Sequence, residues 1–191
     1  MVSSLLVLSK FLYLASATLT IGHLLLLIFF VRNTAGSIRD EYLFLRNRIA
    51  RFAWVWLFST IVFILATLAS ILDLPITSAF DLTMLRSFLM QISLGKSLAL
   101  QTIGALTVAL SISRVRKVSH GALILVLSIF SISIPVFQSH SAAGGSHLIA
   151  IGTLLIHVIG ITLWVGGLSA LVINRKINLT LVISRYSQMA L

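Results

Sequence analysis

Residues 138–172 read QSHSAAGGSHLIAIGTLLIHVIGITLWVGGLSALV. From residue 148 to residue 173 the chain has no Lys, Arg, Asp or Glu, and this run exceeds the roughly 20 apolar residues that cross a bilayer as a helix. It therefore predicts a transmembrane helix. His157 lies near the middle of the run, and a polar group at that depth is costly unless it contacts protein or water.

The whole chain has the composition of an integral membrane protein. Of its 191 residues, 59% are hydrophobic and 9% are charged, whereas about a quarter of the residues of a soluble protein are charged. The net charge of +10 comes from basic residues beside the ends of apolar segments, which indicates membrane topology rather than binding to nucleic acid. Because there is no cysteine, a soft metal would have to be bound by histidine and methionine.

Five apolar segments have the length of membrane spans. They cover residues 11–31, 52–72, 97–113, 121–137 and 148–173. No soluble domain fits between them. The sequence therefore predicts an all-α fold, a polytopic transmembrane helical bundle of about five spans.

Lys and Arg are distributed unequally between the two sides of this bundle. The connections 32–51 and 114–120 and the tail after residue 173 contain five, three and three of them, and the opposite side contains three. Under the positive-inside rule the amino terminus lies outside, the carboxyl end lies inside, and the loop that holds His140 and His147 faces outward.

The outer connection 73–93 contains leucines at helical spacing, which predicts an interfacial amphipathic helix. It also carries Met84 and Met90. These are six residues apart, about 120° off a common helical face, so gap-filling apolar roles are favoured over a pair of thioether ligands.

Two histidines, His23 and His157, lie inside predicted spans. At a rise of 1.5 Å per residue, His23 lies about 18 Å and His157 about 14 Å below the outer end of its span. The two are therefore predicted at similar depth. An imidazole there is expected either to bind a metal or to act as a hydrogen-bonding strut.

Helical spacing also predicts which residues share a face. Ser16, Thr20 and His23 lie on one side of the first span. One side of the fifth span carries Thr153, His157, Gly160, Trp164 and Gly167. Small and polar residues on one stripe predict contact with other helices, with the glycines allowing close backbone approach and Gln101 of the third span hydrogen-bonding across the bundle.

His140 and His147 are predicted in the outer loop. Gly144 and Gly145 between them favour a turn that brings the two imidazoles together at an outer mouth, and simple solvated loop residues are the alternative. His147 precedes His157 by ten residues, about 15 Å along a helix. These two cannot share one ion, so two sites are predicted if both bind metal.

The stretch 138–172 resembles the signature of the copper-resistance D (CopD-type) membrane domain, in which a G/S-H-A loop precedes a helix with a histidine and then W-x-GG-L. The matching residues are Ser139, His140, Ala142, His157, Trp164, Gly166, Gly167 and Leu168. The opening helix FLYLASATLTIGHLLLLIFF is similar to the first span of that family, and RYSQMAL resembles the start of the helix that follows W-x-GG-L.

The resemblance implies a single CopD-like membrane domain over residues 1–191, which stops before a further span of the family. It implies copper handling by a multi-pass protein in the cytoplasmic membrane of a bacterium. Because the domain also occurs fused to cytochrome oxidase assembly modules, copper supply to a respiratory enzyme is one implied setting. The expected partners are the lipid bilayer, further helices, and a copper-binding periplasmic or extracellular protein or an oxidase assembly factor.

We interpret the chain as a copper-handling membrane protein and not as an enzyme. His140 and His147 accept the copper ion at the mouth, and a mid-membrane site uses His157 together with His23, since imidazole binds copper well. Two alternatives remain open from the sequence. One is a haem-binding electron-transfer bundle with His23 and His157 as axial ligands, and the other is a metal-free assembly or scaffold subunit of a respiratory complex.

The orientation can be tested directly because the chain has no cysteine. A cysteine introduced at Ser141 should react with an impermeant maleimide added outside intact cells, whereas one at Ser119 should not. Labelling is measured on the purified protein, with lysed cells as the control for reactivity. The reverse pattern would overturn the orientation.

Overall fold

The computed structural model describes residues 2–30, 38, 43–138 and 147–175. Within these residues the chain is built from helices, and it contains no β-sheet. The helices are α1 (Val2–Leu25), α2 (Phe44–Leu72), α3 (Leu82–Gln91), α4 (Ser93–Ser111), α5 (Val118–Ser133) and α6 (His147–Ile173). A π-helical turn, Leu26–Phe30, continues α1, and 3₁₀ turns cover Ile76–Phe80, Ile112–Arg114 and Ile134–Gln138.

Five of the described helices are long and apolar enough to cross a membrane, which confirms the predicted all-α bundle. Two of them start eight or nine residues earlier than predicted. α1 begins at Val2 rather than at residue 11, and α2 begins at Phe44 rather than at residue 52. Apolar length alone missed these turns because they are helical but contain charged residues, and Arg, Lys and Leu are all good helix formers.

The predicted amphipathic helix of the outer connection is also present, as α3. Its first turn is capped by Asp81, whose carboxylate accepts hydrogen bonds from the backbone N–H groups of Thr83 (2.8 Å) and Met84 (3.1 Å). This satisfies two of the donors that a helix start leaves unpaired. The amphipathic sequence therefore forms a short helix beside the carboxyl-terminal end of α2.

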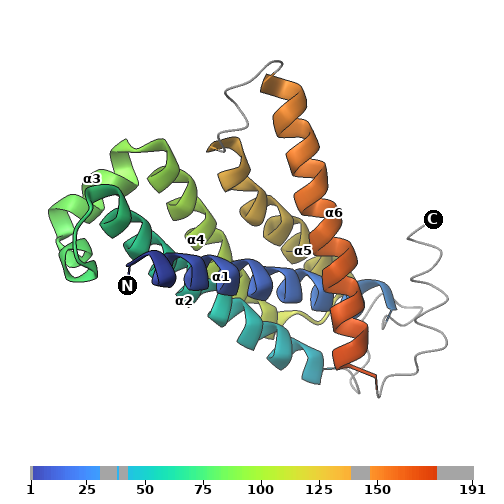
Figure 1. The fold of residues 1–191 in the computed structure, drawn as a ribbon. Helices are drawn as coiled ribbons and strands as arrows, with labels where there is room; N and C mark the ends of the chain where they lie inside the picture. The colour runs from blue at the N-terminus through green and yellow to red at the C-terminus, as the bar shows by residue number, and fades with distance from the viewer. Residues whose placement is uncertain (1, 31–37, 39–42, 139–146, 176–191) are drawn as a thin grey trace.

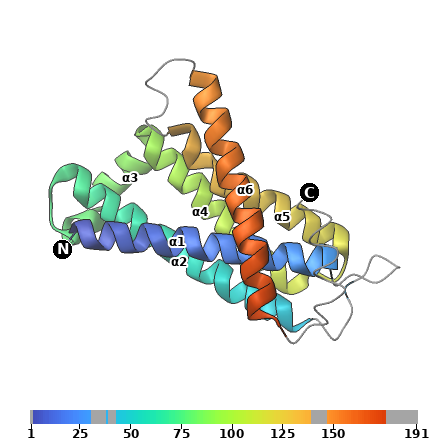
Figure 2. The ribbon, with the colours of Figure 1, turned by 45° about the vertical axis from the view of Figure 1, so that its right-hand side comes forward.

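Four helices form a ring in which each helix packs against two others: α1 and α4 both contact α2 and α5. Figures 1 and 2 both show α1 and α2 side by side along most of their length. The main buried core lies within this ring, and Trp56 and Leu45 of α2 are among its fully buried side chains. We call α1, α2, α4 and α5 the four-helix ring.

α6 lies outside the four-helix ring and crosses α1 in both views (Figures 1 and 2). The crossing is backbone against backbone. A Cβ atom added to Gly22 would lie 1.9 Å from the carbonyl oxygen of Gly166, and one added to Gly166 would lie 2.4 Å from the carbonyl oxygen of Thr18. Only residues without a side chain permit this approach, as at small-residue contacts between other membrane helices.

The buried stripe of α6 differs from the predicted one. Residues four apart along the helix are buried against the bundle, namely Thr162, Gly166, Ala170 and, just after the helix, Asn174. Of the stripe predicted to face inward, Thr153, His157, Gly160 and Trp164 are exposed on the outer side of α6, and Gly167 alone is buried. The predicted inward face of α6 is therefore wrong for Thr153, His157 and Gly160, which are exposed.

Two arginines in the first two turns of α2 have a structural role that their place in the predicted connection 32–51 did not indicate. Arg46 donates a hydrogen bond from Nη1 to the carbonyl oxygen of Val115, just after α4 (3.0 Å). Arg48 donates to the Asn174 side chain and to the carbonyl oxygen of Ile173 at the end of α6 (3.4 Å). Cationic side chains thus satisfy carbonyl groups at the ends of two other helices, where the helix dipole favours positive charge.

The glycine crossing predicts a sharp difference between two matched substitutions. Gly22→Ala forces α6 away from α1 and should destabilise the protein by about 1–3 kcal/mol, the usual cost of overpacking. Gly160→Ala meets nothing within 4 Å, so it should be neutral or stabilising by up to about 1 kcal/mol through helix propensity. Thermal unfolding of both variants in detergent provides the measurement, and equal midpoints would contradict the crossing.

Candidate functional site

His23 is the most deeply buried titratable group that the sequence singled out. Its side chain is 0% exposed, and its ring lies 5.0 Å from the ring of Phe52 on α2, centroid to centroid. Nδ1 lies 2.8 Å from the carbonyl oxygen of Leu19. Because a carbonyl can only accept, Nδ1 carries the proton, and Nε2 presents a bare lone pair.

That lone pair has no hydrogen-bond partner among the described residues, although the Nε2 atom is buried. An unpaired acceptor inside a membrane helix is costly, and a lone pair of this kind can accept a hydrogen bond from water or bind a cation. The π-helical turn Leu26–Phe30 follows three residues after His23. Such turns interrupt regular α-helices at many functional sites.

The shared face of Ser16, Thr20 and His23 is confirmed, since all three side chains are buried. Both hydroxyl groups donate to backbone carbonyls one turn earlier, Ser16 to Leu12 (2.6 Å) and Thr20 to Ser16 (2.8 Å). Their oxygen lone pairs stay available as acceptors. α1 therefore carries a buried polar stripe that ends at His23.

Two further buried polar groups lie in the ring without partners. Gln101 of α4 is 0% exposed, and neither its amide oxygen nor its amide nitrogen has a hydrogen-bond partner among the described residues. The predicted hydrogen bond of Gln101 across the bundle is therefore not formed within that part of the chain. The indole Nε1 of Trp56 on α2 is likewise buried and unpaired. Sequence reasoning missed Trp56, because a tryptophan in an apolar span is usually a packing residue.

The structure does not bring His23 and His157 together. His23 adjoins Gly22 at the crossing of α1 and α6, whereas His157 precedes Gly166, the α6 residue of that crossing, by nine residues or about 13 Å. His157 is also exposed on the outer side of α6, while His23 is enclosed by the bundle. The similar depth inferred from the sequence is therefore wrong as a reason for a shared ion.

The predicted outer mouth falls mostly outside the described residues. His140 is not among them, and of His147 only its position as the first residue of α6 is described. Over the described ranges no group of three or more His, Cys, Asp or Glu side chains is close enough to hold a metal. His140, His147 and His157 therefore stay predicted ligands.

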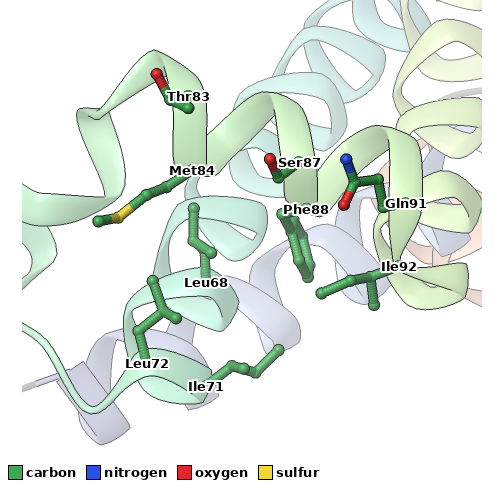
Figure 3. A pocket seen from close by; sticks show the side chains of 9 residues that line it. All are labelled: Leu68, Ile71, Leu72, Thr83, Met84, Ser87, Phe88, Gln91 and Ile92. Carbon is green, nitrogen blue, oxygen red and sulfur yellow. The ribbon is translucent and has the colours of Figure 1, made fainter.

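A separate, mainly apolar cavity of about 280 Å³ lies between the carboxyl-terminal end of α2 and α3 (Figure 3). Its lining residues are Leu68, Ile71, Leu72, Thr83, Met84, Ser87, Phe88, Gln91 and Ile92. Met84 reaches this cavity but Met90 does not, which agrees with their placement on different faces of α3. One thioether in a mainly apolar lining fits the gap-filling role expected of Met84.

Fold and site together define a class: a multi-pass helical membrane protein with polar groups buried inside a ring of spans. Residues 1–148 match the family described as copper resistance protein D-like, N-terminal domain, and the chain belongs to this family. No curated protein and no solved structure matched the chain.

The family match also divides the chain structurally. It covers all of α1 to α5, and therefore the whole four-helix ring, and ends at the second residue of α6. Of the residues that carried the resemblance, His157 and the W-x-GG-L motif lie beyond the match, whereas the opening helix and the loop residues Ser139, His140 and Ala142 lie within it. His23, Trp56 and Gln101 all belong to the matched region.

Proposed function

We propose that this protein binds copper and moves it into or across the membrane, with His23 as an intramembrane ligand. The supporting observation is the His23 side chain itself, which is fully buried with Nδ1–H fixed by the Leu19 carbonyl and Nε2 unpaired. Metal-ligating histidines usually donate their second ring N–H to a carbonyl or carboxylate in this manner, which fixes the tautomer and the ring orientation. The description of the family as copper resistance protein D-like supports copper as that metal.

His140 and His147 form the entry mouth in this proposal, on the extracytoplasmic side. His157 faces away from the four-helix ring, so it serves a separate contact on the outer face of α6. The membrane is the cytoplasmic membrane of a bacterium, and the cargo is exchanged with a copper-binding partner or an oxidase assembly factor. The protein has no catalytic step in this account, since copper is bound and released unchanged.

A haem-binding bundle is less well supported than copper handling. Axial ligation needs two imidazoles on opposite sides of one iron. His157 lies about 13 Å along α6 from the crossing beside His23. His157 is exposed, whereas His23 is buried in the bundle. A purified sample without a Soret band would agree with this conclusion.

The central prediction compares two histidines by the same substitution. His23→Asn retains a hydrogen-bonding group of similar size, so expression and insertion should stay near normal. Copper binding should weaken by at least about tenfold, because loss of even an outer-shell partner of a metal-ligating histidine costs about 10–100-fold. His157→Asn should leave this site intact. Bound copper per protein and copper uptake into proteoliposomes are measured for both variants.

If His23→Asn binds and moves copper like the unmodified protein, His23 is a strut and the intramembrane site is wrong. Loss of copper by His157→Asn alone would place the site on the outer face of α6 instead. Absence of copper from the unmodified protein after metal loading would favour the metal-free scaffold.

The mouth has its own test. If His140 and His147 share one ion, either alanine substitution removes most of the chelation, and the double variant should be little worse than the worse single variant. The deviation from additivity should then be about 0.5–3 kcal/mol in copper-binding free energy, as for residues in direct contact. Additive effects of the two substitutions would show that they do not chelate together.

A further inference from the structure

The unpaired polar groups of the four-helix ring can be placed relative to one another by the packing of its helices. α1 and α2 run antiparallel, because the rings of Tyr13 and Phe63 lie 5.2 Å apart and those of His23 and Phe52 lie 5.0 Å apart. Counting along both helices puts Trp56 level with Thr20. His23 therefore lies about one turn from Trp56 along the ring axis.

The same reasoning places Gln101 of α4. Near the start of α2, Arg46 donates a hydrogen bond to the Val115 carbonyl just after α4 (3.0 Å), so the start of α2 lies beside the end of α4. Counting along the two antiparallel helices from this contact puts Gln101 level with Thr60. Gln101 is thus about one turn from Trp56, on the side away from His23.

Three levels of the ring therefore carry buried polar groups, in the order Gln101, Trp56, His23. Gln101 is level with Thr60 of α2, and His23 is level with Phe52 of the same helix. These two levels are eight residues of α2 apart, or about 12 Å. All three side chains are 0% exposed, and each has at least one unpaired polar atom within the described part of the chain. α5 adds Ser128, also 0% exposed, whose hydroxyl donates to its own helix and keeps its acceptor lone pairs.

The chemistry of the unpaired atoms indicates what they bind. The Trp56 indole and the Gln101 amide nitrogen are donors, which repel a bare cation. The Gln101 oxygen and His23 Nε2 are acceptors. Water serves both kinds, since it donates and accepts, and buried waters in proteins typically pair with about three such groups.

We infer that the interior of the four-helix ring holds a column of bound water that runs from Gln101 past Trp56 to His23. The column gives a small cation a polar route to His23 from the half of the ring nearer α3. This inference deepens the proposed function and rests on it only for the role of His23 as a copper ligand. The bound water itself is inferred from the unpaired polar atoms of the ring.

Cysteine accessibility to silver ion tests the column, since the native chain has no cysteine. Single cysteines replace Gln101 and Thr60, which are 0% exposed and line the ring, and the neighbouring lipid-facing residues Leu100 and Ile61, which are 55% and 38% exposed. Reconstituted protein is treated with silver nitrate, freed of excess silver, denatured in SDS and labelled with a fluorescent maleimide. Labelling without silver controls for expression and thiol integrity.

Gln101→Cys and Thr60→Cys should lose their maleimide labelling after silver treatment, because a hydrated thiol ionises and binds silver. Leu100→Cys and Ile61→Cys should keep it, since a thiol in lipid stays protonated and unreactive. Full labelling of both ring variants after silver would overturn the column, as would equal protection of the lipid-facing pair. Two ring positions are used so that the result does not depend on the folding of one variant.

Repeating the experiment with His23→Asn separates this inference from the proposed function. Protection of Gln101→Cys in that background supports the column even if His23 proves not to bind copper. The opposite result is also possible: silver fails to protect Gln101→Cys and Thr60→Cys, while His23→Asn abolishes copper binding. That result would overturn the column and support the copper site.

Discussion

The constraint behind this structure is that lipid offers no hydrogen bonds, so every polar group in a span must find its partner inside the protein. Serine and threonine meet it locally, by donating to the carbonyl oxygen four residues earlier. This bond is made by Ser9, Ser16, Thr20, Ser59, Thr60, Thr67, Ser97, Thr102, Thr107, Ser128, Ser131, Ser133, Thr153 and Thr162. An imidazole can satisfy only one nitrogen this way, and the described indole and amide at Trp56 and Gln101 satisfy none. Those side chains therefore have polar atoms that water or a bound ion could pair with.

α1 is the element on which the packing converges. It contacts α2 and α5 within the ring and α6 outside it, and 67% of its most apolar stretch is buried, against 17% for α6. A helix with neighbours on several sides needs small residues where those neighbours approach closely. Gly22 is that residue at the crossing with α6. His23 follows immediately, so the residue that admits α6 and the residue with the free lone pair occupy successive positions on different faces of one helix.

Hydropathy was enough to predict the number and order of the spans, because a long apolar run in water has few alternatives to a membrane helix. It was not enough to predict which side of a span faces protein. In α6 nearly every residue is apolar, and the choice of inward face depended on His157 and Gly160, which proved exposed. The true contact stripe depends on Gly166 lying opposite another glycine, and this pairing has no signature within either helix alone. Trp56 was missed for a related reason, since its unpaired N–H exists only once the ring encloses it.

The two histidines of the spans therefore differ both in what surrounds them and in their distance from the crossing of α1 and α6. His23 lies in the region that matches the family, enclosed by the ring, with one nitrogen fixed and the other free. His157 lies beyond that region, on a helix that attaches to the ring through Gly166 and turns the imidazole outward. A ligand reaching His23 must pass through protein, whereas one reaching His157 must come from the side of α6 away from the ring. If copper crosses within the family domain, the ring interior with His23 is the route that the described helices provide.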